Sequence, residues 1–85
     1  MEKNELLFDN SKKFIELGYN IAYYRKHAKL TQEELAERLN ISRQHLGAIE
    51  APNIVRAVSL DLLFNIAAVL NIDAYKLLQF NKETV

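Results

Sequence analysis

The sequence predicts an all-α domain, and three observations lead to this fold class. Apolar residues recur at steps of three and four, as on one face of a helix, and do not alternate as in a strand. The 85 residues include only two glycines and one proline, so the helical stretches have few interruptions. Residues that cap helix N-termini stand before several of these stretches. Five helices are therefore expected.

The first helix is expected to be long. Asn10 or Ser11 can cap it, and its periodicity runs to about His27 or Ala28. Its apolar side is formed by Phe14, Leu17 (or Gly18), Ile21, and Tyr24 or Ala28. Gly18 within a helix is unfavourable by about 1 kcal/mol relative to alanine, so it indicates the close approach of another helix.

The second helix has the clearest start. Thr31 and Glu34 have the spacing of a capping box, in which the threonine hydroxyl accepts from the Glu34 amide and the glutamate reaches back. Its buried side is formed by Leu35, Ala36 and Leu39. Asn40 tolerates the left-handed conformation that ends helices, so the helix is expected to stop there.

The third helix follows at once. Ile41 bridges the two helices, Ser42 caps the third, and Leu46 and Ile49 face inward until about Glu50. Pro52 then prevents the helix from continuing. An unusually apolar loop follows, with Ile54, Val55, Ala57 and Val58.

Two further helices complete the expected fold. Ser59 caps the fourth, whose inward positions are Leu60, Leu63, Ile66 or Ala67, and Leu70. Asp73 caps a short last helix, with Leu77 and Leu78 inward and Tyr75 or Phe80 nearby. The resulting organisation is an N-terminal arm or short helical turn over residues 1–10, a domain over 11–80 and a tail over 81–85.

Composition excludes several classes of protein. There is no cysteine, hence no disulfide scaffold and no thiolate metal site. His27 and His45 have no partner at metal-ligand spacing, and no nucleophile–base pair can be assembled, so neither a cofactor nor an enzyme is expected. No apolar run is long enough to span a membrane, and the acidic start does not resemble a signal peptide, which together predict a cytoplasmic protein.

The charge distribution is uneven although the net charge is zero. Between Lys12 and Arg56 lie eight basic and five acidic residues, whereas the two ends hold three basic and six acidic ones. A neutral total argues against nucleic-acid binding, for which a basic surplus is typical. The basic middle of the chain weakens that objection.

The two short helices joined by Asn40-Ile41-Ser42 form the local pattern of a helix-turn-helix. So short a turn sets the helices at a steep angle, which lets the second one enter a DNA major groove. Tight helical corners also occur in proteins that do not bind DNA. The spacing alone therefore leaves both possibilities open.

Residues 30–43, LTQEELAERLNISR, resemble the Xre/Cro-type helix-turn-helix family of phage and bacterial repressors. The resemblance continues through Ile49-Glu50, Ser59-Leu60 and Ala67 to Ile72, and covers roughly residues 17–78. It implies a five-helix, lambda-repressor-like domain, and the first helix of this chain is expected to extend upstream of the family core. It also implies a protein that is usually dimeric and binds double-stranded operator DNA.

The resemblance assigns roles to individual residues. Base-reading positions are Arg43, Gln44, Gly47 and Ala48. Arginine suits guanine and glutamine suits adenine, whereas Ala48 offers a methyl contact to thymine at most. Phosphate contacts are expected at Gln32, Asn53 and Arg56, at Thr31 besides its role as a cap, and at His45 on the rim of the helix. Arg25 and Glu50 match a structural ion pair.

The chain also departs from the family pattern. Lys29 stands where the family often has the glycine that ends the first helix, and the loop from Glu50 to Ser59 is longer than usual. The apolar residues Ile54, Val55 and Val58 of this loop are candidate contacts with a second subunit. Tyr75, Leu78 and Phe80 form either ordinary core or a dimer seam.

Two functions from different classes fit these observations. The first is a sequence-specific DNA-binding transcriptional regulator, a repressor that binds a two-fold symmetric operator as a homodimer. The second is a helix-turn-helix fold used to bind a protein partner, as an anti-repressor or an antitoxin does. Zero net charge, the small residues Gly47 and Ala48 and the apolar loop favour the second.

Overall fold

The computed structural model describes residues 8–80, so residues 1–7 of the expected arm over 1–10, and the whole tail over 81–85, lie outside the described residues. The four α-helices are α1 (Ser11–His27), α2 (Gln32–Leu39), α3 (Arg43–Glu50) and α4 (Leu60–Leu70). A short 3₁₀ helix, η1 (Ala74–Leu78), follows. Residues 8–80 contain no strand, which confirms the all-α class. The expectation of five α-helices is wrong, because the last element is a 3₁₀ helix.

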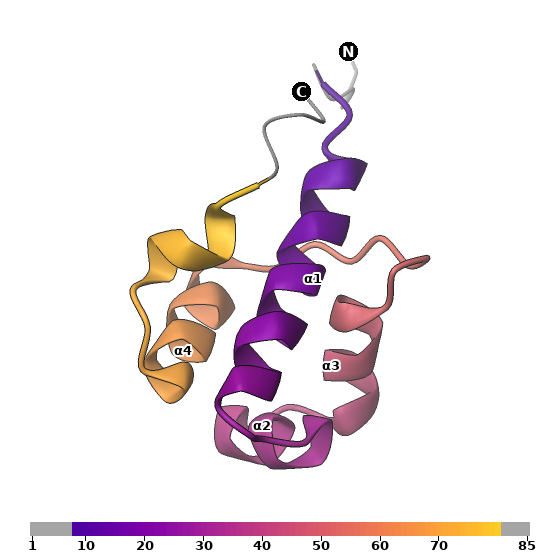
Figure 1. Ribbon diagram of the computed structural model, residues 1–85. Helices are drawn as coiled ribbons and strands as arrows, with labels where there is room; N and C mark the ends of the chain where they lie inside the picture. The colour runs from indigo at the N-terminus through magenta and orange to yellow at the C-terminus, as the bar shows by residue number, and fades with distance from the viewer. Residues whose placement is uncertain (1–7, 81–85) are drawn as a thin grey trace.

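The long helix α1 forms the middle of the molecule (Figure 1). It packs against α3 on one side and against α4 and η1 on the other, while α2 bridges α3 and α4 across the lower end. The largest fully buried side chains are Ile21, Leu35, Leu46, Ile66 and Leu77, one from each element. One core therefore joins all five elements, and it fixes α3 relative to the rest of the domain.

Side-chain caps set the beginnings of three helices. The hydroxyl oxygens of Thr31, Ser42 and Ser59 each accept a hydrogen bond from the backbone N–H three residues later, at 2.9–3.1 Å. These caps confirm the predicted starts of α2, α3 and α4. Asn10 and Asp73, by contrast, make no side-chain cap bond at α1 and η1.

Left-handed residues end α1, α2 and α4. They are Lys29, Asn40 and Asn71, with φ of 61°, 58° and 58°. At the end of α1, the Lys29 N–H donates to the Lys26 carbonyl at 2.9 Å, and the Leu30 N–H donates to the Arg25 carbonyl at 3.1 Å. This pair of bonds is a Schellman motif, and it recurs after α2 and α4. Lysine thus occupies a position that favours glycine.

The C-terminal element is short for a reason that lies in α1. The Asn20 amide donates to the carbonyls of both Leu77 and Gln79 at 3.0 Å. These bonds hold the segment after η1 against α1 in an extended conformation, so the helix does not continue. The unfilled cap at Asp73 gives η1 no compensating stabilisation at its start.

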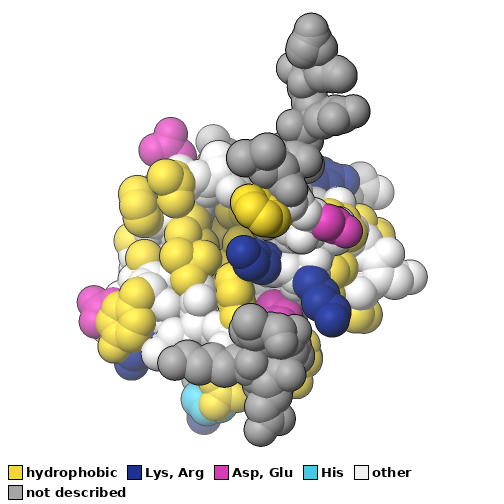
Figure 2. All heavy atoms as spheres, turned by 90° about the horizontal axis from the view of Figure 1, so that it is seen from above, with side chains coloured by type: hydrophobic (Ala, Val, Ile, Leu, Met, Phe, Trp, Pro, Cys, Tyr) yellow, Lys and Arg dark blue, Asp and Glu magenta, His cyan; other side chains and the backbone are white. Residues whose placement is uncertain are grey.

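Several large apolar side chains remain exposed. Leu60, expected in the core, is 66% exposed. At about 100° per residue it lies only about 20° around the helix from the buried Ala67, so its angular position does not exclude it from the inward stripe. It is exposed because no described element covers this side of the first turn of α4. Tyr19 and Tyr23 on α1 are exposed too, whereas Tyr24 and Phe14 pack against the core. Seen from above, hydrophobic side chains gather on the side where α4 and η1 lie (Figure 2).

None of the described helices is long and apolar enough to cross a membrane.

Candidate nucleic-acid interface

The candidate reading surface is the outer side of α3. At about 100° per residue, positions 43, 44, 47 and 48 fall within an arc of roughly 140°. Leu46 and Ile49 lie on the opposite side of the helix and are buried. Arg43 and Gln44, in the first turn, are exposed. The four predicted base-facing positions therefore share one surface, with the two long polar side chains at its N-terminal end.

Close packing holds α3 against α1. A Cβ atom on Gly18 would overlap the carbonyl oxygen of Ile49 and lie 3.1 Å from its carbonyl carbon. Only glycine therefore allows the two backbones to approach so closely, as the position of Gly18 within α1 indicated. Gly47 differs, because a Cβ there would meet only the Gln32 side-chain oxygen, at 3.7 Å. Packing therefore does not require glycine at position 47. Because Gly47 has no side chain, nothing projects from the outer side of α3 at this position.

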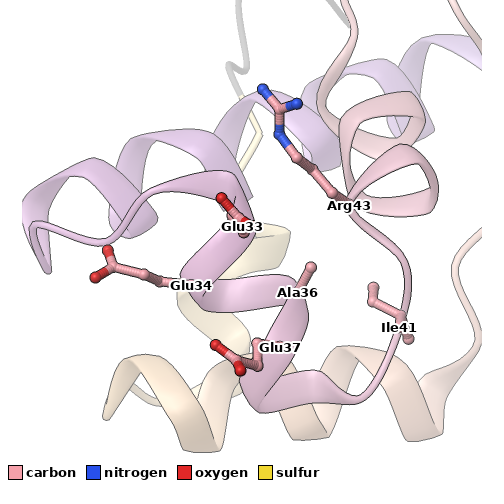
Figure 3. Close-up of a pocket in the computed structure, with 6 residues that line it drawn as sticks. All are labelled: Glu33, Glu34, Ala36, Glu37, Ile41 and Arg43. Atoms are coloured by element: carbon pink, nitrogen blue, oxygen red, sulfur yellow. The ribbon is translucent and has the colours of Figure 1, made fainter.

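Carboxylates of α2 border this surface (Figure 3). A hollow of about 390 Å³ is lined by Glu33, Glu34, Ala36, Glu37, Ile41 and Arg43. The Arg43 side chain extends from the start of α3 away from Glu34 and Glu37. A phosphate backbone would be repelled by the outer side of α2 and attracted to Arg43. Two of these carboxylates, Glu33 and Glu34, lie in the first turn of α2. The side-chain charges thus favour an approach along α3.

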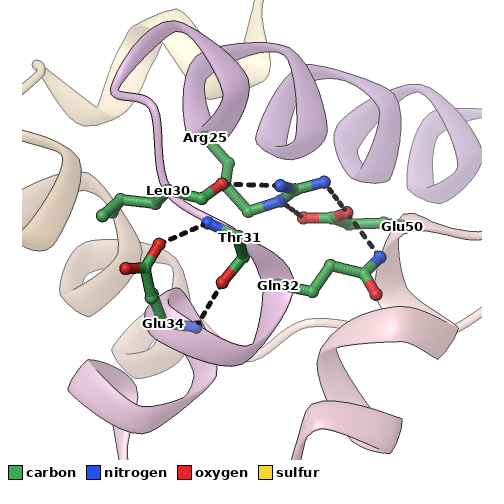
Figure 4. Close-up of polar contacts among 6 residues, drawn as sticks. All are labelled: Arg25, Leu30, Thr31, Gln32, Glu34 and Glu50. Carbon is green, nitrogen blue, oxygen red and sulfur yellow. Dashed lines mark hydrogen bonds and ion pairs between the residues drawn. The ribbon is translucent and has the colours of Figure 1, made fainter.

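A buried network ties α1, α2 and α3 together (Figure 4). Arg25 binds Glu50 through two parallel hydrogen bonds, Nε to Oε2 at 2.8 Å and Nη2 to Oε1 at 2.9 Å. The third guanidinium nitrogen donates to the Leu30 carbonyl at 2.7 Å. The two side chains are only 9% and 4% exposed. Arg25 and Glu50, which the resemblance gave as a structural ion pair, therefore form a bidentate arginine–carboxylate pair.

Gln32 belongs to the same network. Its Nε2 donates to Glu50 Oε1 at 2.9 Å, so this amide links the first turn of α2 to the last residue of α3. The side-chain oxygen of Gln32 lies beside Gly47, next to the reading surface. The sequence did not reveal this hydrogen bond, because the two residues are 18 positions apart.

The N-terminus of α2 carries a complete capping box. The Glu34 N–H donates to Thr31 Oγ1 at 3.0 Å, and the Thr31 N–H donates to Glu34 Oε1 at 2.8 Å. The bonds from the Thr31 backbone N–H and then from its hydroxyl hold the pKa of Glu34 below its ordinary value. The Thr31 hydroxyl oxygen is used within the chain, whereas the first-turn amides of Gln32 and Glu33 have no partner inside the helix.

A helix-turn-helix family model matches residues 21–77, about two thirds of the chain. The chain belongs to the helix-turn-helix family. It is of the Xre/Cro type that residues 30–43 indicated. The family consists of DNA-binding regulators and not of enzymes, in agreement with the sequence. Among residues 8–80, no cluster of three or more histidines or carboxylates could hold a metal ion.

Solved structures of other helix-turn-helix proteins are similar. A hypothetical transcription factor, NHTF from Neisseria, is 28% identical with a TM-score of 0.74, over 95% of this chain and 91% of its own. SinR, a master regulator of biofilm formation solved with DNA, is 32% identical with a TM-score of 0.68, over 74% of this chain and 98% of its own. The restriction-modification controller C.AhdI from Aeromonas hydrophila is 27% identical with a TM-score of 0.71, over 78% and 97%. No curated protein matches the sequence.

The remaining predicted positions of this helix-turn-helix protein lie outside the network. His45 is half-buried at the edge of α3, and Asn53 and Arg56 are exposed in the loop before α4. Of the candidate subunit contacts, Ile54, Val55, Tyr75 and Leu78 are exposed. Val58 and Phe80 are partly buried against the core of the chain itself. Phe64 of α4 is a large exposed residue that the sequence did not single out.

Proposed function

We propose that this helix-turn-helix protein is a transcriptional regulator that reads operator DNA through the first turn of α3. The observation that carries the proposal is the exposure of Arg43 and Gln44 on the outer arc of a helix whose opposite side is buried. Each bidentate contact with a base, arginine to guanine or glutamine to adenine, provides about 1–3 kcal/mol of discrimination. Gly47 and Ala48 add little side chain, so they let the helix lie deep in the groove.

Phosphate contacts would orient α3 without reading sequence. The free amides in the first turn of α2 suit a phosphate oxygen, and Gln32 lies at the same end. Gln32 is held by Glu50, so its side chain is already fixed before DNA arrives. Arg56 and Asn53 in the loop, and His45 at the rim, are the further phosphate contacts in this proposal. Thr31 contributes as the cap that shapes the site.

The regulator would act as a homodimer that represses by occupying a two-fold symmetric operator. One short α3 carries only two long polar side chains on its arc, which is too few to specify a site in a genome. Two copies would double the number of base-reading side chains and would place them on half-sites one helical turn apart. SinR, solved in complex with DNA, and C.AhdI, a controller protein, are regulators with the same fold.

The test is selection of bound duplexes from a random pool, followed by affinity measurements across salt concentrations. A genuine DNA-binding protein gives a steep negative slope of log K against log salt. Arg43→Ala and Gln44→Ala should each relax the preference at defined base pairs. Lys13→Ala and Gln79→Ala are the matched controls, because both residues are exposed, Lys13 lines a hollow with Leu78 and Phe80, and Gln79 follows η1. A protein that retains no duplex at low salt would contradict the proposal.

Protein binding is the second candidate function. The exposed aromatic side chains of α1 favour it, because Tyr19 and Tyr23 lie one turn apart and Tyr23 also stacks on His27 at 4.5 Å between ring centroids. Tyrosine is enriched at the centres of protein interfaces. A SinR structure contains the protein SinI, so a neighbour of the same fold has a protein partner. Loss of a partner on Tyr19→Ala, with DNA binding unchanged, would support this function.

A further inference from the structure

The side-chain amide of Gln32 is oriented by the buried network between α1, α2 and α3. Its Nε2 donates to Glu50 Oε1 at 2.9 Å, and the same carboxylate accepts two hydrogen bonds from Arg25. A carboxylate can only accept hydrogen bonds, so the nitrogen of the amide must face Glu50 and the oxygen must face away from it. Figure 4 shows this arrangement. The network thus decides that the oxygen is the end of the amide left for a ligand.

This oxygen lies beside the middle of the reading surface on α3. A Cβ atom on Gly47 would lie 3.7 Å from Gln32 Oε1. Gly47 shares the outer arc of α3 with Arg43 and Gln44, and it has no side chain to cover the oxygen. Among residues 8–80, no donor forms a hydrogen bond to this oxygen. An unused acceptor therefore borders the one position of the arc that contributes no side chain of its own.

We infer that Gln32 is a specificity-determining residue, whose side-chain oxygen accepts a hydrogen bond from cytosine N4 in the major groove. The inference rests on the proposed function and deepens it. Phosphate oxygens are themselves acceptors, so the phosphate contact at this end falls to backbone N–H groups of α2. The donors that bases present in the major groove are adenine N6 and cytosine N4. Adenine is bound by the oxygen and nitrogen of an amide together, whereas cytosine needs an acceptor alone. Because Glu50 holds the nitrogen, the geometry favours cytosine.

The same network makes the oxygen a better acceptor. A hydrogen bond from Nε2 to a carboxylate polarises the amide and increases the negative partial charge on its oxygen. A free glutamine loses much side-chain entropy when a contact immobilises it. Gln32 is already held by Glu50, so little of that loss remains when DNA binds. Arg25 neutralises the Glu50 carboxylate, which therefore does not repel the duplex from this position.

Base preferences of the native chain and of Gln32→Met test the inference. Duplexes selected from a random pool give the preferred base at each position of the site, and methionine keeps the side-chain length without the acceptor. At one position, the preference for cytosine over thymine should fall roughly 3- to 10-fold, because thymine presents an acceptor that the native oxygen repels. Other positions should be unchanged. Gln79→Met, the same substitution at an exposed residue after η1, is the matched control. Far-UV circular dichroism checks that Gln32→Met remains folded, as expected while Arg25 still pairs with Glu50.

Three results would overturn the inference alone. An equal loss of affinity for every sequence with Gln32→Met would make the side chain a phosphate contact. Unchanged affinity and preferences would leave it a purely structural role, and a relaxed preference for adenine would contradict the assignment to cytosine. In each case Arg43→Ala and Gln44→Ala still relax the preference at their own positions, so the proposed function stands. A native chain that selects no sequence would contradict both.

Discussion

The sharpest prediction concerns Gly18, because its surroundings decide the sign of a substitution that helix propensity alone would misjudge. Alanine favours a helix over glycine by about 1 kcal/mol. At Gly18, however, the added Cβ overlaps the Ile49 carbonyl oxygen and lies 3.4 Å from Glu50 Cα. Both obstacles are backbone atoms, so neither can rotate away. The α1 and α3 helices must separate to admit the methyl group.

The magnitude follows from two opposing terms. Forcing an extra methyl group into a packed interior destabilises by about 1–3 kcal/mol, and more where the backbone must move. After subtraction of the gain in helix propensity, we expect Gly18→Ala to lower the free energy of unfolding by about 2 kcal/mol or more. In a domain of this size that corresponds to a fall in the melting temperature of about 10 °C or more.

Gly47→Ala is the matched control within the same protein. Its Cβ would meet only the Gln32 oxygen at 3.7 Å, an ordinary contact, so the propensity gain remains. We expect this variant to be more stable by up to about 1 kcal/mol. Urea titrations followed by far-UV circular dichroism measure both changes. A Gly18→Ala variant as stable as the native chain would refute the close-packing interpretation, whatever the result at Gly47.

Four further predictions follow from the network and the helix ends. Glu50→Ala should destabilise the fold by about 3–5 kcal/mol in urea titration, because it leaves a buried arginine without its carboxylate; a loss below about 1 kcal/mol would contradict this. Lys29→Gly should stabilise by roughly 0.5–1 kcal/mol, since glycine has no Cβ penalty in the left-handed region, whereas Lys29→Ala should not. The lowered pKa of Glu34 implies stability that is present above its ordinary value of 4.5 and lost as pH falls through the lower folded value. Melting temperatures across that window should fall less for Glu34→Gln than for the native chain, and an equal fall would count against the capping box. Glu37→Gln should strengthen duplex binding roughly two- to fivefold at low salt by removing a repulsive charge, with Asp61→Asn, on α4, as the unchanged control.

Helix boundaries were accessible to sequence analysis because they depend on neighbours in the chain. The Thr31–Glu34 box joins residues three apart, and the Ser42 and Ser59 caps act over the same distance. The left-handed end at Asn40 is equally local. These signals predicted where α2, α3 and α4 begin. They also revealed the tight corner between α2 and α3, which indicated the helix-turn-helix family.

The tertiary structure decided which side chains act together. Gln32 is fixed by Glu50 across 18 residues, and Asn20 ends η1 across 57. Periodicity placed Leu60 in the core, but burial depends on whether another element covers that side of α4. Sequence by itself thus determined the starts and caps of α2, α3 and α4, because these depend on contacts within one turn, and through the corner between α2 and α3 it determined the family. Only packing between distant segments could show how α3 is held and which apolar surface remains uncovered.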